Sequence, residues 1–431
     1  MNLKEFIKIL ASKGLLIKID KPLDVKFEIP TIMKKLDGRP ILFSNVKGYD
    51  MPVVANICST RELIALGLEI DEKEIIHRLA KAIDSPVEPE VVDPEKMGGY
   101  QEFNGTLDEL PILTYHPFDG GPYIASAIVI ASDSELGLNA SYHRMMKRGK
   151  DELVLRILQR HFNEFLKRGN KEFAICIGNS ISTLVGAAVS AELGKSELAI
   201  ANALNKINVI ELGGHKVPEA EIVMIAEMTG EESPEGPFLD LTETVDIVRD
   251  QRVARIKQIF CRDNPTFHGL LPGGLEHKIL MGMPREPTIY REVSKVCEVK
   301  DVLVTPGGTS WLHGAVSIKK KSPDDGKNAI HAAFKGHKSM KHVFIVDDDI
   351  DIHDPYQIEW AMATRFQGDS DLVLLPNQKG SSLDPSANPE TRETTKIGFD
   401  LTIPSDRDPK YFKKPELPLD IDISEFVDEC E

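Results

Sequence analysis

The order of predicted strands and helices differs between the middle and the last third of this sequence, and this difference constrains its fold more than any other feature. The middle of the chain holds a succession of runs typical of β-strands, among them 219–228 and 254–261. Two further runs, 125–133 and 138–149, are joined by the turn signal DSELG, which predicts a β-hairpin. The last third instead alternates short apolar strands with helices, which predicts an α/β arrangement with partly parallel pairing.

These patterns of strands and helices, together with a linker candidate, predict three domains. Apolar residues at helical spacing between Leu3 and Leu15, followed by short strand-like runs, predict a small α/β opening unit. The stretch 84–99 is rich in proline and acid and has little apolar periodicity, so it is the best linker candidate. We therefore expect an N-terminal α/β domain at 1–98, a central domain at 99–295 and a C-terminal α/β domain at 296–431.

Two helices are expected inside the central domain. The segment 151–169 has acids first and bases last, as the helix dipole favours, and it predicts an amphipathic helix. The segment 196–206 predicts a second helix, with Ser196 as its N-cap.

The charge balance argues against a nucleic-acid partner. The 431 residues include 52 Lys and Arg against 68 Asp and Glu, which gives a formal net charge of −16. Such a chain would bind a phosphate backbone against its own long-range field. The five cysteines are scattered without a C-x-x-C pair, and no window approaches 18 uninterrupted apolar residues. We therefore expect a cytoplasmic protein that does not span a membrane.

One acidic loop has the character of a catalytic site. Pro234 and Pro237 restrict the backbone on both sides of Glu235, and Gly236 permits unusual dihedrals. Glu235 and Asp240 are thus expected close together on a rigid loop, where paired carboxylates can perform acid–base chemistry. Acidic loops rich in proline and glycine are also common without catalysis, so both interpretations stay open.

Other polar residues have ordinary interpretations when each is considered alone. Asn139 and Arg144 are five apart, so a regular strand would direct them to opposite faces unless a bulge intervenes. His161 suits a helix surface, and Glu197 suits the first turn of a helix. The acidic run 347–354 could hold a hard cation, but it also marks the exit of an apolar strand into solvent.

Together, these pieces resemble the UbiD family of decarboxylases, which use prenylated flavin mononucleotide. Six motifs occur in the family's order over nearly the whole chain. They are N-x-x-x-x-R at 139–144, His161, the Ser-Glu pair at 196–197, P-E-G-P-F-x-D at 234–240, and two C-terminal segments at 308–321 and 344–366. The resemblance implies a central flavin-binding split β-barrel and a C-terminal domain used for self-association, in a homo-oligomer of unspecified size.

The resemblance also assigns roles to residues. It implies that Arg144 binds the substrate carboxylate, that Asp240 donates the proton and that Glu235 orients Arg144. It implies a divalent metal, taken to be Mn²⁺, on Asn139, His161 and Glu197; a K⁺ ion is usual in the family, with no ligands assigned here. The residues implied to line the flavin are Tyr142, His143, Arg144, Arg156, Ile157, Leu158, Arg160 and His161. Glu276 is a lower-ranked candidate at the border of the site.

The expected substrate is a small phosphorylated acid. The chain is most similar to an archaeal branch of the family, which implies conversion of trans-anhydromevalonate 5-phosphate to isopentenyl phosphate and CO₂ in isoprenoid biosynthesis, with a flavin prenyltransferase supplying the cofactor. Aromatic residues make up only 6% of the chain, which weighs against the alternative, decarboxylation of 3-polyprenyl-4-hydroxybenzoate or another aromatic acid. A non-catalytic flavin-binding member is the other alternative. The candidate cations for the substrate phosphate are His143, Lys147, Arg148, His215 and Lys216.

Overall fold

The computed structural model describes residues 1–97 and 99–415, and its N-terminal part is a small α/β unit. Three short strands form most of its sheet, in the order β1 (Ile17–Ile19), β2 (Ile41–Phe43) and β3 (Val53–Ala55). The fourth strand, β18 (Phe267–Gly269), comes from much later in the chain and pairs parallel to β3. The unit's helices are α1 (Leu3–Ser12), α2 (Glu28–Lys35), α3 (Arg61–Leu68) and α4 (Ile75–Asp84). The opening unit is therefore completed by a strand that its own sequence does not contain.

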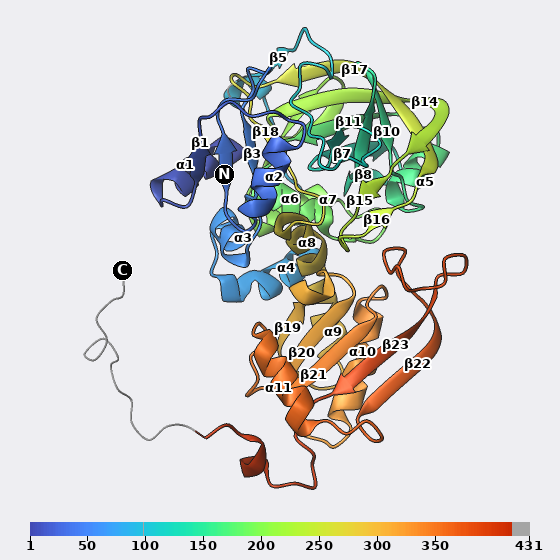
Figure 1. Cartoon of the computed structure of the whole chain (residues 1–431). Coiled ribbons are helices and arrows are strands. Elements are labelled where there is room, and N and C mark those ends of the chain that lie inside the picture. Colours follow the sequence, from blue (N-terminus) through green and yellow to red (C-terminus); the bar gives the residue numbers. More distant parts are fainter. Residues whose placement is uncertain (98, 416–431) are drawn as a thin grey trace, which may run out of the picture.

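The central part is built on a nine-stranded sheet, in which the long strands β14 (Ile222–Glu235) and β17 (Arg249–Cys261) arch over their neighbours (Figure 1). The expected hairpin is confirmed, because β7 (Ile128–Asp133) and β8 (Gly137–Tyr142) pair antiparallel. The remaining strands of this sheet are β5 (Gln101–Glu102), β6 (Tyr123–Ile124), β9 (Met145–Arg148), β10 (Glu152–Leu155) and β11 (Glu172–Ile177).

The helix expected over 151–169 is wrong in its first half. Residues 152–155 form strand β10, which pairs with β9 on one side and with β17 on the other, and only α5 (His161–Lys167) is helical. Leu153, Val154 and Leu155 are fully buried in the sheet. Pairing with strands on both sides outweighs the local charge pattern that suggested a helix.

The stretch expected as a linker contributes to the sheet structure. Strand β4 (Glu90–Val92) pairs parallel with β12 (Asn208–Leu212), which in turn pairs with β13 (His215–Pro218). Two helices precede β12, namely α6 (Ile181–Ala188) and α7 (Glu197–Leu204). As expected, Ser196 caps α7, and its hydroxyl accepts a hydrogen bond from the Ala199 amide.

A second lobe contains the α/β alternation expected for the last third (Figure 1). Its sheet runs in the order β19 (Glu298–Val304), β20 (His313–Lys319), β21 (His342–Asp347), β23 (Glu393–Asp400) and β22 (Leu372–Lys379), with both parallel and antiparallel pairs. The helices α8 (Leu275–Gly282) and α9 (Glu286–Val293) connect the central part to this lobe, which also contains α10 (Asp325–Gly336) and α11 (Pro355–Arg365).

The acidic run at the end of β21 is structural. The fully buried side chain of Arg365 donates hydrogen bonds to Asp347 and Asp349, and His353 contacts Asp301. In residues 1–97 and 99–415, no three His, Cys, Asp or Glu side chains are grouped as a metal site. The arginine, rather than a cation from solution, compensates these carboxylates.

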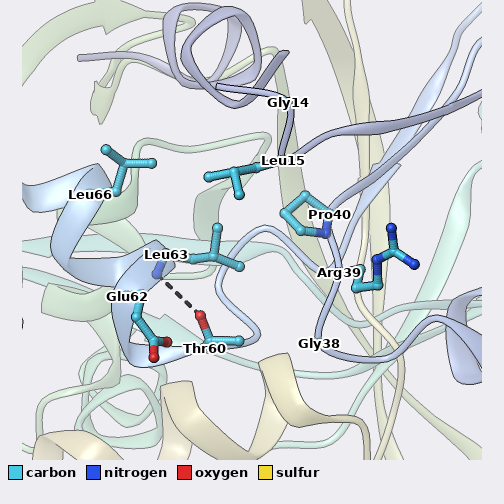
Figure 2. A pocket seen from close by; sticks show the side chains of 9 residues that line it. All are labelled: Gly14, Leu15, Gly38, Arg39, Pro40, Thr60, Glu62, Leu63 and Leu66. Atoms are coloured by element: carbon cyan, nitrogen blue, oxygen red, sulfur yellow. Dashed lines mark hydrogen bonds between the residues drawn. The ribbon is translucent and has the colours of Figure 1, made fainter. Parts of the chain in front are cut away.

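A surface pocket of about 270 Å³ lies in the N-terminal unit, between the end of α1 and the start of α3. Figure 2 shows the side chains of Leu15, Leu63 and Leu66 around it, with the Thr60 hydroxyl accepting a hydrogen bond from the Leu63 amide. None of the residues that line this pocket is among those expected at the catalytic site. Within the described part of the chain, no helix has the length and apolarity needed to cross a bilayer.

Candidate active site

Arg144 lies at a break between two strands. β8 ends at Tyr142 and β9 begins at Met145, so His143 and Arg144 are outside the regular pleat. The alternation of a regular strand therefore does not extend from Asn139 to Arg144. The break releases the Arg144 side chain from the face that a continuous strand would impose.

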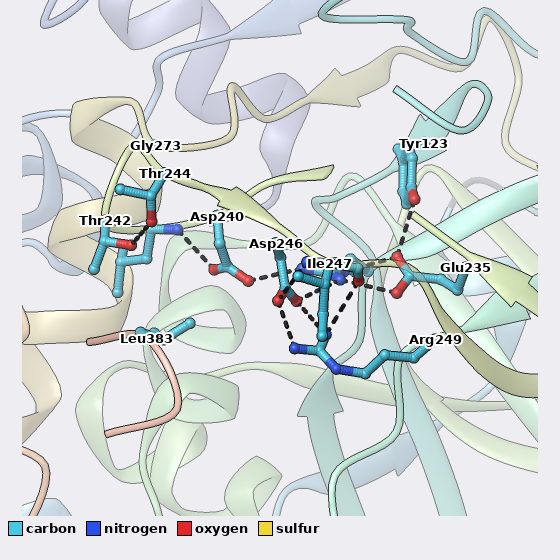
Figure 3. A network of polar contacts seen from close by, with 12 residues as sticks. Tyr123, Glu235, Asp240, Thr242, Thr244, Asp246, Ile247, Arg249, Gly273 and Leu383 are labelled. Atoms are coloured by element: carbon cyan, nitrogen blue, oxygen red, sulfur yellow. Dashed lines mark hydrogen bonds and ion pairs between the residues drawn. The ribbon is translucent and has the colours of Figure 1, made fainter. Parts of the chain in front are cut away.

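Arg144 forms hydrogen bonds with both predicted catalytic acids. Figure 3 shows these acids, Glu235 and Asp240, in one polar network. The Nε and Nη2 atoms of Arg144 donate to Glu235 Oε1 and Oε2 at 2.9 and 2.8 Å. Its Nη1 atom donates to Asp240 Oδ2 at 2.7 Å. The Glu235 side chain is 0% exposed and the Asp240 side chain 19% exposed. The acid that solvent can reach is therefore Asp240.

The two acids reach Arg144 from separate short elements. Glu235 is the last residue of β14, so the expectation that it lies on a loop is wrong. Asp240 directly follows β15 (Phe238–Leu239), which pairs with β16 (Val245–Asp246). Gly236, between them, has φ of 100°, and a β-carbon there would lie 3.3 Å from the Ile247 carbonyl oxygen. This conformation requires glycine because other residues are strained at such dihedrals.

Sequence reasoning missed a third acid in this network. Asp246 Oδ2 accepts a hydrogen bond from Arg144 Nη2 at 2.9 Å, and both Asp246 oxygens accept from Arg249 at 2.6 Å. Burial alone would raise the pKa of Asp246, but Arg249 and Arg144 lower it to about 2. Asp246 is therefore a fixed negative charge that holds Arg144 in place. No motif in the sequence marks it.

Tyr123 is a second missed member. Its hydroxyl donates to Glu235 Oε1 at 2.9 Å, from the sheet edge at β6. Burial, together with Glu235, raises the pKa of Tyr123, so the hydroxyl keeps its proton and stays a donor. Glu235 therefore has an N–H or O–H donor on each oxygen, which compensates its complete burial.

Glu276 lies outside this network. Its carboxylate accepts hydrogen bonds from the backbone amides of Asn56 and Cys58 at 2.9 and 3.0 Å, and it contacts His268. It joins the loop after β3 to helix α8, and its side chain is fully buried. We therefore assign Glu276 to structure rather than to the border of the site.

The three predicted metal ligands lie together. Asn139 Nδ2 is 3.1 Å from Glu197 Oε2, and His161 Nδ1 is 3.9 Å from Glu197 Oε1. The residues come from β8, from the start of α5 and from the start of α7. An amide oxygen, an imidazole and a carboxylate form a donor set that suits a divalent cation of intermediate hardness. The set fits the predicted metal, whose presence stays a prediction.

The residues predicted to line the flavin flank the break in the strand. His143 Nδ1 contacts the Arg156 carbonyl oxygen at 3.1 Å, and the Arg156 amide donates to the Arg144 carbonyl at 3.1 Å. The segment from Ile157 to Arg160 then leads into α5, with the Ile157 amide donating to Gln251. Unlike these residues, Tyr142 contacts a helix: its hydroxyl donates a hydrogen bond to the carbonyl oxygen of Leu184 in α6.

The candidate cations for a substrate phosphate are not arranged as one site. Burial lowers the pKa of His143 to about 4, so this residue is neutral at pH 7. Lys147, Arg148 and His215 contact the carboxylates of Asp108, of Glu152 and Glu231, and of Glu172, respectively. Lys216 lies exposed on β13.

Comparison with known proteins places the chain in a family. Models of the UbiD family, described as 3-octaprenyl-4-hydroxybenzoate carboxy-lyase domains, match residues 7–83 (N-terminal), 92–275 (Rift-related) and 278–401 (C-terminal). The anhydromevalonate phosphate decarboxylase of Methanothermobacter thermautotrophicus is 40% identical over 90% of this chain and 93% of its own length. The enzyme of the same name from Methanocaldococcus jannaschii is also 40% identical, over 93% of this chain and 97% of its own.

Solved structures extend the similarity to the fold. The UbiD-class enzyme HmfF from Pelotomaculum thermopropionicum, in complex with FMN, superposes with a TM-score of 0.95 at 34% identity, covering 99% of this chain and 100% of HmfF. An evolved dimeric form of HmfF, in complex with prFMN, has a TM-score of 0.90 at 32% identity, covering 99% of this chain and 100% of its own. This chain therefore belongs to the UbiD family of carboxy-lyases.

Proposed function

We propose that this chain decarboxylates trans-anhydromevalonate 5-phosphate to isopentenyl phosphate and CO₂ with prenylated FMN. The observation that carries the proposal is the buried network in which Arg144 holds Glu235 and Asp240. The substrate is supported by the archaeal relatives at 40% identity, and the cofactor by the prFMN complex of HmfF. The intact network argues against a non-catalytic flavin-binding member.

Arg144 retains one donor for a substrate carboxylate. A guanidinium has five N–H groups. Four of them are directed at Glu235, Asp240 and Asp246. The remaining one is on Nη1, the same nitrogen that contacts Asp240. A carboxylate bound there would lie beside Asp240, the solvent-accessible acid, which is then placed to donate a proton to the carbon that loses CO₂.

The cofactor would supply the chemistry that breaks the carbon–carbon bond, and residues of the chain would hold the cofactor and the metal in place. Prenylated FMN, when bound, provides the electron sink for breaking the carbon–carbon bond. The segment from Arg156 to His161, beside His143, would hold the flavin. Asn139, His161 and Glu197 would hold the divalent metal, for which we propose Mn²⁺. A K⁺ ion is a further proposal, without assigned ligands.

The cellular setting is also proposed. A flavin prenyltransferase would supply the cofactor, and the net charge of −16 suits an enzyme of the cytoplasm. We propose a homo-oligomer, with self-association through the C-terminal domain at 296–431. A central flavin-binding domain at 99–295, of split-barrel type, and an N-terminal domain at 1–98 complete the proposed division.

The proposed function is tested by product formation. Full-length protein, co-expressed with a flavin prenyltransferase and supplied with Mn²⁺, should release isopentenyl phosphate and CO₂ from trans-anhydromevalonate 5-phosphate. Chromatography with mass detection measures the product. A 3-polyprenyl-4-hydroxybenzoate and 3,4-dihydroxybenzoate are the matched alternative substrates. Turnover of an aromatic acid without isopentenyl phosphate would make the substrate proposal wrong while retaining the family chemistry.

The metal site has its own test. Glu197→Ala removes the carboxylate shared by Asn139 and His161, so we expect bound Mn²⁺ to fall by about tenfold or more. Elemental analysis of the purified protein measures it. Glu192→Ala is the matched control, because Glu192 is 82% exposed and pairs with Lys195. Unchanged Mn²⁺ in the Glu197 variant would reject the ligand set.

A further inference from the structure

The surface pocket of the N-terminal unit has an apolar lining and none of the catalytic residues. Pro40 and Leu63 are buried in its wall, and Leu66 is half-buried beside them. Leu15 lines the same pocket and is 44% exposed. Figure 2 shows Leu15, Pro40 and Leu63 directed toward one another. Apolar side chains that gather around an open depression favour association, because burying them removes apolar area from water.

Two side chains of opposite charge line this pocket as well. Arg39 and Glu62 are both exposed, and Figure 2 shows them on opposite sides of Leu63. Within the described part of the chain, neither side chain forms an ion pair or a hydrogen bond. Arg61, the neighbour of Glu62, is directed elsewhere, because its guanidinium donates to the buried Glu286 at 2.8 Å. The pocket therefore presents one positive and one negative charge, each without compensation.

We propose that this pocket is a contact between two copies of the chain related by a two-fold axis. In such a contact the same surface faces itself, so that a residue i meets the partner's residue j and the reverse is also true. Arg39 of each copy would pair with the partner's Glu62, and Leu15 would be buried against the partner's apolar lining. A small ion would compensate only one of the two charges, whereas a second copy compensates both.

The two parts of this surface would do different work. Burial of the leucines supplies the affinity, whereas exposed ion pairs add little free energy and mainly decide which surfaces meet. The lining residues all lie between Gly14 and Leu66, so this contact is separate from the self-association proposed for the C-terminal domain. A chain with two different two-fold contacts forms an assembly larger than a dimer.

Charge reversal on the full chain tests the contact. Arg39→Glu would place two carboxylates opposite each other twice in every contact, so we expect its dissociation constant to rise by about tenfold or more. The mass in solution, measured by analytical ultracentrifugation over a range of protein concentrations, should fall accordingly. The double variant Arg39→Glu, Glu62→Arg should recover the mass of the unsubstituted chain, because both pairs form again with their signs exchanged.

The remaining mass reports on the C-terminal contact separately. A dimer of the Arg39→Glu variant would show that self-association through the C-terminal domain persists, and a monomer would show that it does not. Either result supports the N-terminal contact, provided that the unsubstituted chain is larger. Catalytic turnover is not needed, so a chain that loses mass in this variant but forms no isopentenyl phosphate would support the contact and contradict the proposed substrate.

Two further variants separate a specific contact from a general effect. Lys35→Glu makes the same charge change on α2, at an exposed residue that does not line the pocket, and should leave the mass unchanged. Leu15→Ser removes the exposed apolar side chain and should weaken the contact by about tenfold. Circular dichroism checks that each variant is folded.

Three results would overturn the inference. One is an equal mass for the unsubstituted chain and the Arg39→Glu variant at every concentration. Another is a double variant that stays as small as the single one, which would mean that the two charges do not meet. The third is an equal loss of mass in Lys35→Glu, which would assign the effect to net charge rather than to this surface.

Discussion

Asp240→Asn is expected to lower kcat by about a thousandfold, which is within the range for loss of a general acid. The carboxamide keeps the shape of the side chain and an oxygen that can accept from Arg144 Nη1, but it cannot deliver the proton. Flavin content should stay unchanged, because Asp240 belongs to the acid network and not to the segment from Arg156 to His161. Steady-state formation of isopentenyl phosphate measures the effect, because the proton is delivered after CO₂ has left, and the flavin absorbance band measures occupancy.

Glu243→Gln is the matched control for that substitution. Glu243 lies three residues further on, and its side chain is 43% exposed and pairs with Lys34 and Lys278. Neither ion pair touches the network around Arg144, so kcat should stay within about twofold of the unsubstituted enzyme. An Asp240→Asn enzyme with full activity would remove Asp240 from the role of proton donor.

Arg144→Gln is expected to cost about 3–5 kcal/mol of stability, the range for removing one partner of a buried ion pair. Glu235 would remain completely buried with Tyr123 as its hydrogen-bond donor, and Asp240 and Asp246 would lose their shared partner. The first urea unfolding transition should move to lower urea concentration. Decarboxylation should be lost as well, because the donor for the substrate carboxylate is gone.

Arg249→Gln tests the specificity of this effect. Arg249 also binds Asp246, but its side chain is 28% exposed and does not contact Glu235 or Asp240. We expect a loss of about 1 kcal/mol or less. Equal destabilisation by the two substitutions would mean that burial of Glu235 does not depend on Arg144.

Local patterns predicted local structure well. The turn signal at 133–137 and the strand-like runs on both sides of it predicted the hairpin of β7 and β8, and Ser196 was predicted as the N-cap of α7. In both cases, the decisive contacts join residues close together in the chain. The segment 151–169 shows the limit, because residues 152–155 pair with β17, about a hundred residues away, and become a strand.

The residues of the candidate site also fall into two groups: those that sequence motifs predicted and those that only the tertiary structure revealed. Arg144, Glu235 and Asp240 could be nominated because they stand in an ordered series of motifs, although Glu235 is 91 and Asp240 96 residues from the arginine. Asp246 and Tyr123 could not, because nothing in their own surroundings distinguishes them from solvated polar residues. Their roles arise from the pairing of β15 with β16 and from the position of β6 at the sheet edge.

By itself, the sequence determined the chemical groups, the family pattern and the short-range elements, because these depend on residue type and spacing. The tertiary structure alone decided which charges are buried and what compensates them. In the tertiary structure, Arg365 binds the acids at the end of β21, and Arg144 binds three carboxylates at once. Arg285, in contrast, is buried without a carboxylate partner among the described residues. The physical reason is that the free energy of a charge depends on its solvation and its partners, both of which are set by long-range packing.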